Sequence, residues 1–431
     1  MDGNIWELYG INSNPFTTDP LLIKGGILRI ECFVGRDKEL LELNRKFHSS
    51  GNSRILIIGD VGVGKTSFVN YARFNAIKEG YFTPIPEIAV LHDWDALQFV
   101  MNTLYSIYIT IKNFDNYVGI ISKGQYKKLE SLFEINSKSG YSLGLDIAGF
   151  GGSYSQSRVA PTFVLYKTIV DLTKEIINEI YNKKQKELII HYNNLERIDS
   201  NDLVRLFGDL RDFFQTPHVH FIFVGNLMTN NAIQGISQVS SIFSEPIILR
   251  NMSYDEVKEV IDIRLNKLKI EGVKQIKPFN DSALKMLFGL YNGNIRHILN
   301  SLDKAVTSSV RNIPIVLDDN DVARILSNQI EETYLKNIKP RARDVLLKIV
   351  ESEEITNKGI SNALKMPRPQ VSIYLSDLKN SGCIVLRRQD GKDKFWTSAP
   401  HFKWLLLKKP QLSKDLNQKL LSTAKGFVDL V

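Results

Sequence analysis

Glycines, a lysine and a threonine stand at fixed spacing near the start of the chain. The run Gly59-Asp-Val-Gly-Val-Gly-Lys-Thr66 fits the pattern G-x-x-x-x-G-K-[ST] in full. Glycines let backbone N–H groups turn inward around phosphates, and the N-terminus of a following helix adds positive potential. At this spacing the lysine reaches the β- and γ-phosphates, and the threonine hydroxyl is offered to Mg²⁺. The predicted phosphate-binding residues are Gly59, Asp60, Val61, Gly62, Val63, Gly64, Lys65, Thr66 and Ser67, with Thr66 as the metal ligand.

Short apolar strands must hold this loop in place. A buried strand at 54–58 runs directly into it, and a helix is predicted from about Lys65 onward. Three more runs of the same kind lie downstream, and a helical segment at 163–181 separates the first strand from them. Strands that alternate with helices predict an α/β fold with a parallel sheet covered on both sides. The three further predicted strands are 187–192, 219–224 and 245–249.

Residues 136–160 interrupt this alternation. Apolar and small residues alternate from Tyr141 to Ile147, which is the period of a strand, and a glycine-rich turn follows. We interpret the segment as a β-hairpin inserted into the α/β domain. A disordered loop is the alternative, because glycine inside a strand weakens it.

Three segments around the loop together resemble AAA+ and STAND ATPases. Phe33-Val-Gly-Arg-Asp-Lys-Glu-Leu40 resembles the box that opens such domains, Asn226 stands where they place sensor 1, and Gly293-Asn-Ile-Arg296 resembles their sensor 2 motif. The resemblance extends from about residue 33 to residue 306 and is closest to initiators of the origin-recognition kind. It implies ATP and Mg²⁺ as cofactors, with Val34, Gly35 and Arg36 beside the adenine and Arg296 near the γ-phosphate.

The chain departs from this pattern where acids are expected. The second strand of such proteins ends in two acids that hold the metal shell and polarise water, whereas here Asn193-Asn194 follows it. An amide carries no negative charge and cannot act as a general base. Glu196 can compensate, or the asparagines merely cap the next helix. We therefore expect tight nucleotide binding with slow hydrolysis, which Asn193→Asp should raise, or whose Mg²⁺ dependence it should tighten.

A trans-acting arginine is also missing from its usual place. The stretch 238–243, shortly before the last predicted strand, contains no arginine. Such an arginine stabilises charge on the γ-phosphate in the transition state. Arg211 is a candidate substitute, although a solvated or paired helix arginine is the simpler interpretation.

The excess positive charge of the chain is confined to its last quarter. The net charge is +8, yet the first 336 residues carry 37 basic and 38 acidic side chains. Residues 337–410 carry 15 basic and 7 acidic side chains. Such an imbalance favours an anionic polymer as partner of this segment alone, although a solvated face is the ordinary explanation.

The same segment has the pattern of a winged helix. Helices at 343–350, 356–364 and 367–378 precede two strands that flank the turn Gln389-Asp-Gly-Lys392. This arrangement resembles DNA-binding winged helices, although such domains also bind proteins. The resemblance implies double-stranded DNA as partner. The residues that it would place in the major groove are Arg368, Gln370, Ser372 and Tyr374. Those that it would place along the phosphates are Arg387, Arg388, Lys392 and Lys394.

The whole sequence predicts a three-layer P-loop AAA+ module with parallel sheet, helical lid and C-terminal winged helix. The predicted parts are an N-terminal arm (1–32), the ATPase domain (33–250), the lid (251–336), the winged helix (337–405) and a tail (406–431). No apolar run approaches the roughly 20 residues of a membrane span, and the two distant cysteines and the absence of a signal sequence predict a cytoplasmic location. We interpret the chain as a weak ATPase that couples nucleotide state to DNA binding or assembly, and we expect it to associate with other subunits or copies of itself. The alternative is a STAND-like signalling or defence switch whose winged helix binds protein.

Overall fold

The computed structural model describes residues 4–49, 51–114, 117–138, 162–310, 313–352 and 354–408. The chain forms two compact units, one of residues 20–250 and one of residues 1–19 together with 251–431. The predicted hairpin at 136–160 lies outside the described residues, except for 136–138, which end helix α4 (Lys123–Lys138). Of the predicted tail at 406–431, only residues 406–408 are described.

A five-stranded parallel sheet forms the centre of the unit at 20–250. The strands lie in the order β2-β3-β4-β1-β5, and each predicted strand is found within two residues of its expected limits. The middle strands are fully buried, which accounts for their continuous apolar runs. The bounds are β1 (Ser53–Gly59), β2 (Ile88–Ala89), β3 (Leu188–Asn193), β4 (Val219–Gly225) and β5 (Ile247–Leu249).

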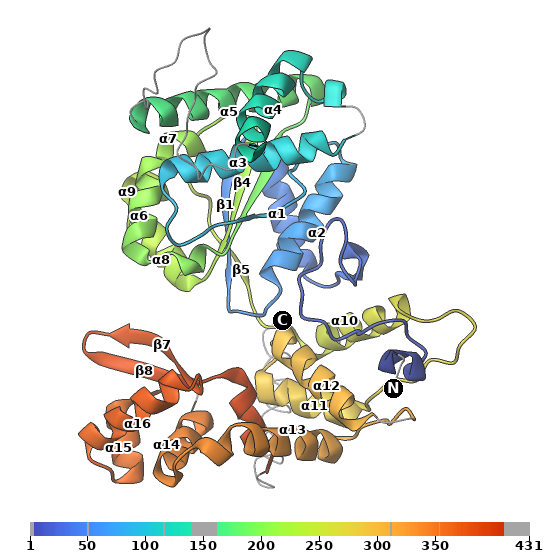
Figure 1. Ribbon diagram of the computed structural model, residues 1–431, viewed down its shortest axis with the longest axis vertical. Helices are drawn as coiled ribbons and strands as arrows, with labels where there is room; N and C mark the ends of the chain where they lie inside the picture. The colour runs from blue at the N-terminus through green and yellow to red at the C-terminus, as the bar shows by residue number, and fades with distance from the viewer. Residues whose placement is uncertain are drawn as a thin grey trace, which may run out of the picture. The chain divides into compact units, whose positions relative to one another are not determined.

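Helices cover both faces of this sheet (Figure 1). Helices α1 (Asp37–Ser49) and α2 (Lys65–Lys78) lie on one face, and the longer series from α3 to α9 lies on the other. A cluster of stacked and edge-on rings, including Phe99, Tyr192 and Phe223, fills the second interface. The bounds on that side are α3 (Ala96–Lys112), α5 (Thr162–Lys184), α6 (Ser200–Asp209), α7 (Arg211–Phe214), α8 (Leu227–Gln234) and α9 (Ser237–Ser240).

The second unit begins with a bundle of four helices. The N-terminal residues belong to it: the Tyr9 hydroxyl donates to the Ile315 carbonyl at 3.0 Å, and the Arg264 guanidinium donates to the carbonyls of Pro15 and Thr17. Residues 1–19 therefore pack on the helical unit rather than forming one separate arm with 20–32. The helices are α10 (Tyr254–Lys267), α11 (Asp281–Tyr291), α12 (Ile295–Ser309) and α13 (Asp319–Thr333).

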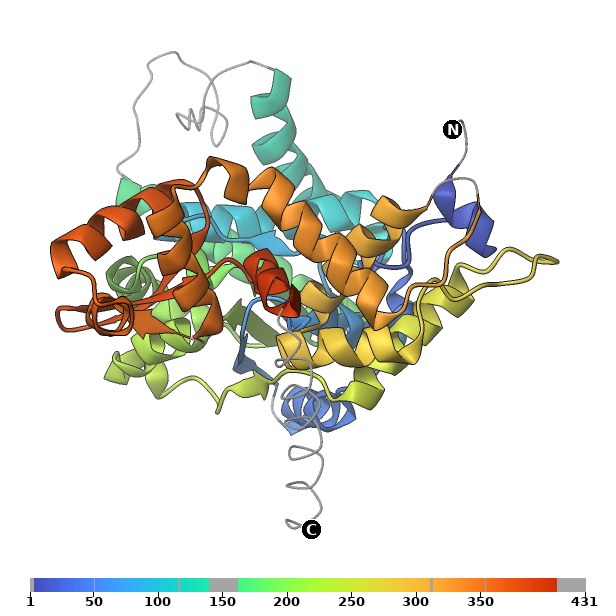
Figure 2. The same ribbon diagram turned by 90° about the horizontal axis from the view of Figure 1, so that it is seen from below.

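Three helices and a small antiparallel sheet follow in the same unit and form the winged helix (Figure 2, orange to red). The Thr356 hydroxyl accepts a hydrogen bond from the Gly359 backbone N–H and caps the second of these helices. The predicted fold class is thus confirmed. The elements are α14 (Pro340–Glu351), β6 (Ile355–Thr356), α15 (Asn357–Leu364), α16 (Arg368–Asn380), β7 (Ile384–Asp390) and β8 (Asp393–Ser398).

A 3-10 helix, η6 (Pro400–Lys408), fastens the winged helix to the helical bundle. The Trp404 indole N–H donates to the Ser301 hydroxyl of α12 at 2.9 Å, and the Tyr291 hydroxyl donates to the Pro400 carbonyl at 3.2 Å. All three side chains are buried. Separating η6 from the bundle would break both bonds and leave the Trp404 indole N–H and the Pro400 carbonyl without these partners.

Within the described residues, no helix is both long and apolar enough to cross a membrane.

Replacing Trp404 should weaken this unit measurably. We expect Trp404→Ala to lower the free energy of unfolding by about 3–5 kcal/mol, because it leaves a large cavity and removes the hydrogen bond that the Ser301 hydroxyl accepts. Trp404→Phe keeps most of the ring volume and should cost only about 1 kcal/mol for the missing hydrogen bond. Urea denaturation followed by circular dichroism measures both. Equal stability of the alanine variant and wild type would show that η6 does not hold the unit together.

Candidate functional site

The predicted phosphate loop leaves the sheet at β1, between β4 and the edge strand β5. At Gly59, the last residue of β1, a Cβ atom would lie 2.4 Å from the Leu249 carbonyl oxygen of β5. Gly62 and Gly64 both adopt φ 92°, a conformation that residues with side chains rarely take. Helix α2 then begins at Lys65, directly after the loop. The glycines are therefore required by close approach and by backbone geometry, as the loop pattern predicts.

The Lys65 side chain folds back over the loop. It is 8% exposed, and its ammonium group donates to the carbonyls of Gly59 at 2.8 Å and Asp60 at 3.0 Å. An ammonium group held above a glycine turn at the N-terminus of a 14-residue helix fits a phosphate chain in both charge and shape. The residues present therefore fit a nucleotide triphosphate.

Thr66 meets the end of strand β3. The Asn193 amide nitrogen lies 3.2 Å from the Thr66 hydroxyl oxygen, and the Asn193 amide oxygen lies 3.4 Å from it. Asn194 adopts φ 67° and precedes the short 3-10 helix η4 (Leu195–Arg197) without a side-chain capping bond. The alternative that these asparagines merely cap the next helix is therefore wrong. Asn193 faces the predicted metal ligand.

The acid nearest to this pair is one that sequence reasoning missed. The Asn193 amide nitrogen donates to Glu87 Oε1 at 2.9 Å, whereas no hydrogen bond among the described residues joins Glu196 to Asn193 or Thr66. Glu87 immediately precedes β2, a strand of only two residues between proline-rich turns, so no apolar periodicity marks it. The only sign of Glu87 in the sequence is a glutamate that directly follows Pro86 and precedes two apolar residues.

A buried arginine, Arg73, lies within electrostatic reach of Glu87. Every guanidinium nitrogen of Arg73, which is 0% exposed, donates to a neutral acceptor: the Thr83 hydroxyl, the Asn70 amide oxygen and the carbonyls of Pro84 and Ile85 are among them. Burial lowers the pKa of Arg73 to about 10, partly offset by the charge of Glu87. Burial and the neighbouring Arg73 hold the pKa of His191 well below its usual value. This histidine is packed and neutral.

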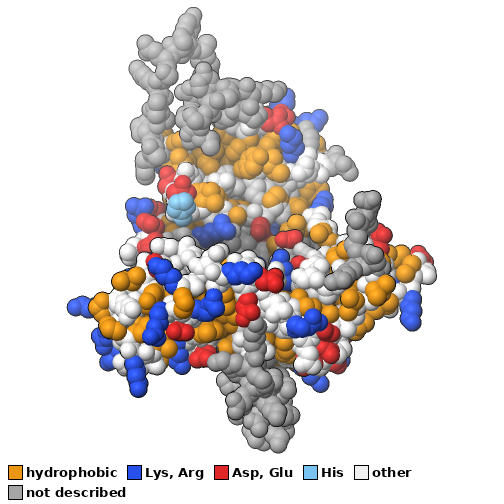
Figure 3. All heavy atoms as spheres, turned by 60° about the horizontal axis from the view of Figure 1, so that its bottom comes forward, with side chains coloured by type: hydrophobic (Ala, Val, Ile, Leu, Met, Phe, Trp, Pro, Cys, Tyr) orange, Lys and Arg blue, Asp and Glu red, His pale blue; other side chains and the backbone are white. Residues whose placement is uncertain are grey.

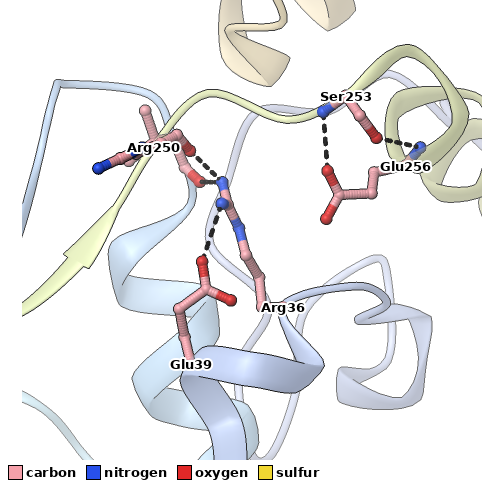
Figure 4. A network of polar contacts seen from close by, with 6 residues as sticks. Arg36, Glu39, Arg250, Ser253 and Glu256 are labelled. Carbon is pink, nitrogen blue, oxygen red and sulfur yellow. Dashed lines mark hydrogen bonds and ion pairs between the residues drawn. The ribbon is translucent and has the colours of Figure 1, made fainter. Parts of the chain in front are cut away.

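Arg36, from the predicted adenine box, points to main-chain groups (Figure 4). Its guanidinium donates to the carbonyls of Arg250 and, at 3.4 Å, of Val63, and it pairs with Glu39 at 3.4 Å. Arg36 adopts φ 67° and follows Gly35 at φ 75°, so Val34 and these two residues form a turn beside the phosphate loop. This turn ties the loop to the end of β5. The contact with adenine stays a prediction.

Asn226 follows β4 and caps helix α8. Its side-chain oxygen accepts a hydrogen bond from the Thr229 backbone N–H at 3.0 Å, and the Thr229 hydroxyl accepts one from the Asn226 backbone N–H at 3.3 Å. The predicted sensor residue is thus already engaged in a reciprocal cap. Arg211, the candidate trans arginine, donates to the Gln238 carbonyl and pairs with Asp212 at 3.3 Å, so the paired helix arginine is what the structure shows.

Arg296 stands in the first turn of α12, in the second unit, and its side chain is exposed. The turn before it requires a glycine, because a Cβ at Gly293 would lie 2.0 Å from the Met252 carbonyl oxygen. Nearby, Ser253 and Glu256 cap helix α10 reciprocally (Figure 4). The approach of Arg296 to a γ-phosphate stays a prediction.

The predicted DNA-contacting residues of helix α16 line its outer side. Arg368 and Gln370 are exposed, the Gln370 amide donates to the Tyr374 hydroxyl at 3.3 Å, and the Ser372 hydroxyl accepts from Asn357 at 2.6 Å. On the face of the molecule that Figure 3 shows, lysine and arginine side chains are scattered among hydrophobic ones.

The wing cations fall into two groups. Lys392 and Lys394, at and just after the hairpin turn, are exposed. Arg388 instead makes a bidentate pair with Glu354 and lies 3.5 Å from the centre of the Phe395 ring, and Arg387, at a β-bulge, lies 3.9 Å from the same carboxylate. Glu354 therefore offsets part of the positive charge that the sequence assigned to phosphates.

Comparison with known proteins gives distant relatives. No family model matches the chain. An uncharacterized HTH-type transcriptional regulator of Methanocaldococcus jannaschii is 21% identical over 388 residues, covering 87% of this chain and 88% of that protein. The chain is similar to the origin-recognition AAA+ proteins. The Aeropyrum pernix Orc2 structure (ADPNP–ADP complexes) is 15% identical with a TM-score of 0.44, and covers 95% of this chain and 98% of its own.

Two further origin-recognition structures resemble this chain with similar identities and TM-scores. Cdc6p from Pyrobaculum aerophilum is 12% identical with a TM-score of 0.43, over 95% of this chain and 99% of that one. Aeropyrum pernix Orc1 in complex with DNA is 13% identical with a TM-score of 0.42, over 94% and 96%. Because all these TM-scores are below 0.5, the fold assignment rests on the chain's own sheet and loop.

Lys65 provides the direct test of the phosphate site. We expect Lys65→Ala to lower ATP affinity by about 10–100-fold or more, since each charge-assisted hydrogen bond to a phosphate contributes about 1.5–3 kcal/mol. Isothermal titration calorimetry measures the affinity, and the circular dichroism spectrum should stay unchanged. Lys78→Ala, at the other end of the same helix, is the matched control. Unaltered ATP affinity in Lys65→Ala would contradict the site.

Proposed function

We propose that this chain is an ATP-binding AAA+ protein that couples its nucleotide state to binding of double-stranded DNA, or to assembly, through its winged helix. The observation that carries the proposal is the complete phosphate loop between β1 and α2, with Lys65 folded over it and Thr66 beside Asn193. Mg²⁺, when bound, would neutralise phosphate charge, and the residues placed to hold it are Thr66 and, through water, Asn193.

Slow hydrolysis follows from the side chains around the loop. A general base has to accept a proton from water, and the amide of Asn193 cannot do so. The oxygen of Asn226 already accepts two hydrogen bonds from Thr229, so its use in orienting water competes with the cap of α8. We therefore infer that the chain holds ATP for long periods and acts as a nucleotide-dependent switch.

Helix α12 supports the coupling to the winged helix. It carries Arg296 in its first turn and Ser301 less than two turns later, and Ser301 bonds Trp404 of the segment that follows the wing. A displacement of α12 in response to nucleotide would thus carry the winged helix with it. Such a rigid connection is what a two-state switch requires to pass a local change to a distant surface.

Double-stranded DNA is supported as the partner by the charge of 337–410 and by the exposed outer side of α16. Lysine and arginine at a helix–turn–helix with a wing give affinity through phosphate contacts. The Methanocaldococcus jannaschii relative is described as an HTH-type regulator, which agrees with this interpretation.

A protein partner, as in a STAND-like switch, is the second candidate because of two features of the winged helix. Glu354 already pairs with Arg388, and three large apolar side chains are exposed nearby: Ile373 at 61%, Val385 at 48% and Leu386 at 40%. Large exposed apolar side chains are more typical of protein interfaces than of DNA-binding surfaces.

The salt dependence of DNA binding by the full chain separates these candidates. Replacing Arg387, Lys392 and Lys394 by alanine should weaken binding to all duplexes alike. The slope of log affinity against log salt should flatten by about 0.9 for each DNA phosphate that the variant no longer neutralises. Arg368→Ala should instead reduce preference for a particular site. Fluorescence anisotropy over a salt series measures both.

Glu354→Gln is the opposing variant in the same experiment. It removes the carboxylate that pairs with Arg387 and Arg388, so we expect it to tighten DNA binding and steepen the salt slope. If wild type shows no salt-dependent affinity for duplex DNA at low ionic strength, DNA is not the partner, and the protein-binding candidate takes its place.

A further inference from the structure

We propose that Glu87 supplies the negative charge of the metal shell that strand β3 lacks, so that the acid of this site comes from the neighbouring strand. The inference rests on the proposed function, because it concerns Mg²⁺ bound together with ATP. It assigns a role to a residue outside every motif of the chain.

The geometry brings three segments to one point. In the parallel ladder Ile88 pairs with Tyr192 and Ala89 with Asn193, so the residue before β2 lies next to the end of β3. Asn193 bridges the two sides: its amide nitrogen lies 2.9 Å from Glu87 Oε1 and 3.2 Å from the Thr66 hydroxyl. The carboxylate is therefore one side chain away from the predicted metal ligand.

The hydrogen bond to Glu87 also orients the Asn193 amide. A carboxylate accepts but cannot donate, so the amide nitrogen must face Glu87. The amide oxygen, 3.4 Å from the Thr66 hydroxyl oxygen, stays an acceptor and can receive a hydrogen bond from a metal-bound water. Glu87 in this way both fixes the acceptor and brings a charge that Mg²⁺ requires from its surroundings.

The second oxygen of Glu87 has no partner in the described part of the chain. Oε2 is buried and makes no hydrogen bond there. A buried carboxylate oxygen normally finds a donor, because leaving it without one costs about 1–3 kcal/mol or more. A hydrated cation beside Thr66 would provide such a donor through its waters.

Charge balance with Arg73 is the competing explanation for Glu87. No ion pair joins the two side chains in the described structure, and the guanidinium of Arg73 is bonded to neutral acceptors throughout. Their interaction therefore acts through space. Charge balance alone predicts that loss of the Glu87 carboxylate lowers stability but leaves the effect of Mg²⁺ on ATP binding unchanged.

Calorimetric titration of the full chain with ATP, in Mg²⁺ and in EDTA at equal ionic strength, tests the assignment. We expect wild type to bind ATP more tightly with Mg²⁺, and Glu87→Gln to reduce this gain about 10–100-fold while leaving Mg²⁺-free affinity nearly unchanged. Glu187→Gln is the matched control, because Glu187 precedes β3 at the opposite end of the sheet. It should keep the full gain.

The double variant Glu87→Gln with Asn193→Asp returns the carboxylate to β3 and keeps one amide–carboxylate pair. We expect it to restore the gain from Mg²⁺, and it serves as the test if Glu87→Gln fails to fold. Asn193→Asp alone places two carboxylates in hydrogen-bond contact, which raises the pKa of one of them. This revises the expectation from sequence that Asn193→Asp by itself tightens Mg²⁺ dependence.

The outcomes are distinct. A full gain from Mg²⁺ in Glu87→Gln overturns the assignment, as does a loss of the gain in Glu196→Gln in its place. Failure of the double variant to restore the gain also overturns it. If wild type binds no ATP under either condition, the proposed function itself fails, which is a different result.

Discussion

No side chain fits at Gly59, and the rest of the α/β unit depends on that close approach. Strand β1 runs between β4 and β5, and at its last residue the β5 carbonyl comes within 2.4 Å of where a Cβ atom would stand. The chain can therefore leave the sheet at the end of β1 in a turn of glycines and enter α2 at once. Both faces of the sheet are occupied by helices, so this turn opens only at the carboxyl end of the strands, where ligands of such sheets bind.

A polar line runs inward from this turn through an otherwise apolar domain. It passes from Thr66 through Asn193 and Glu87 toward Arg73 and His191, all of them on β2, β3, α2 or the adjoining turns. Buried polar groups cost free energy unless they are bonded, and this line is bonded at nearly every atom. Two of its buried atoms have no hydrogen-bond partner within the described residues, His191 Nε2 and Glu87 Oε2, and the second is the one that a bound cation beside Thr66 would complete.

The sequence predicted those parts whose cause is local. The glycine spacing at 59–66, the apolar strands and the hairpin turn at Gly391 all depend on neighbouring residues, and each lies where it was expected. The role of Glu87 depends on pairing between strands about 100 residues apart in sequence, and β2 is too short to show a pattern. The pairing of Glu354 with Arg388 and the packing of residues 1–19 on the helical unit are likewise long-range or tertiary, so charge counts and motif order did not reveal them.

The central claim is that one molecule couples a nucleotide at the phosphate loop to DNA at the winged helix. If ATP changes the affinity for DNA, DNA must change the affinity for ATP by the same factor. The coupling can therefore be measured from the affinity for duplex DNA alone, by fluorescence anisotropy with and without saturating ATP and Mg²⁺. The account predicts a change in DNA affinity of about 5–150-fold, the usual range for coupled sites, and no such change in the Lys65→Ala variant. Identical DNA affinity in both conditions, with ATP shown to be bound, would contradict it.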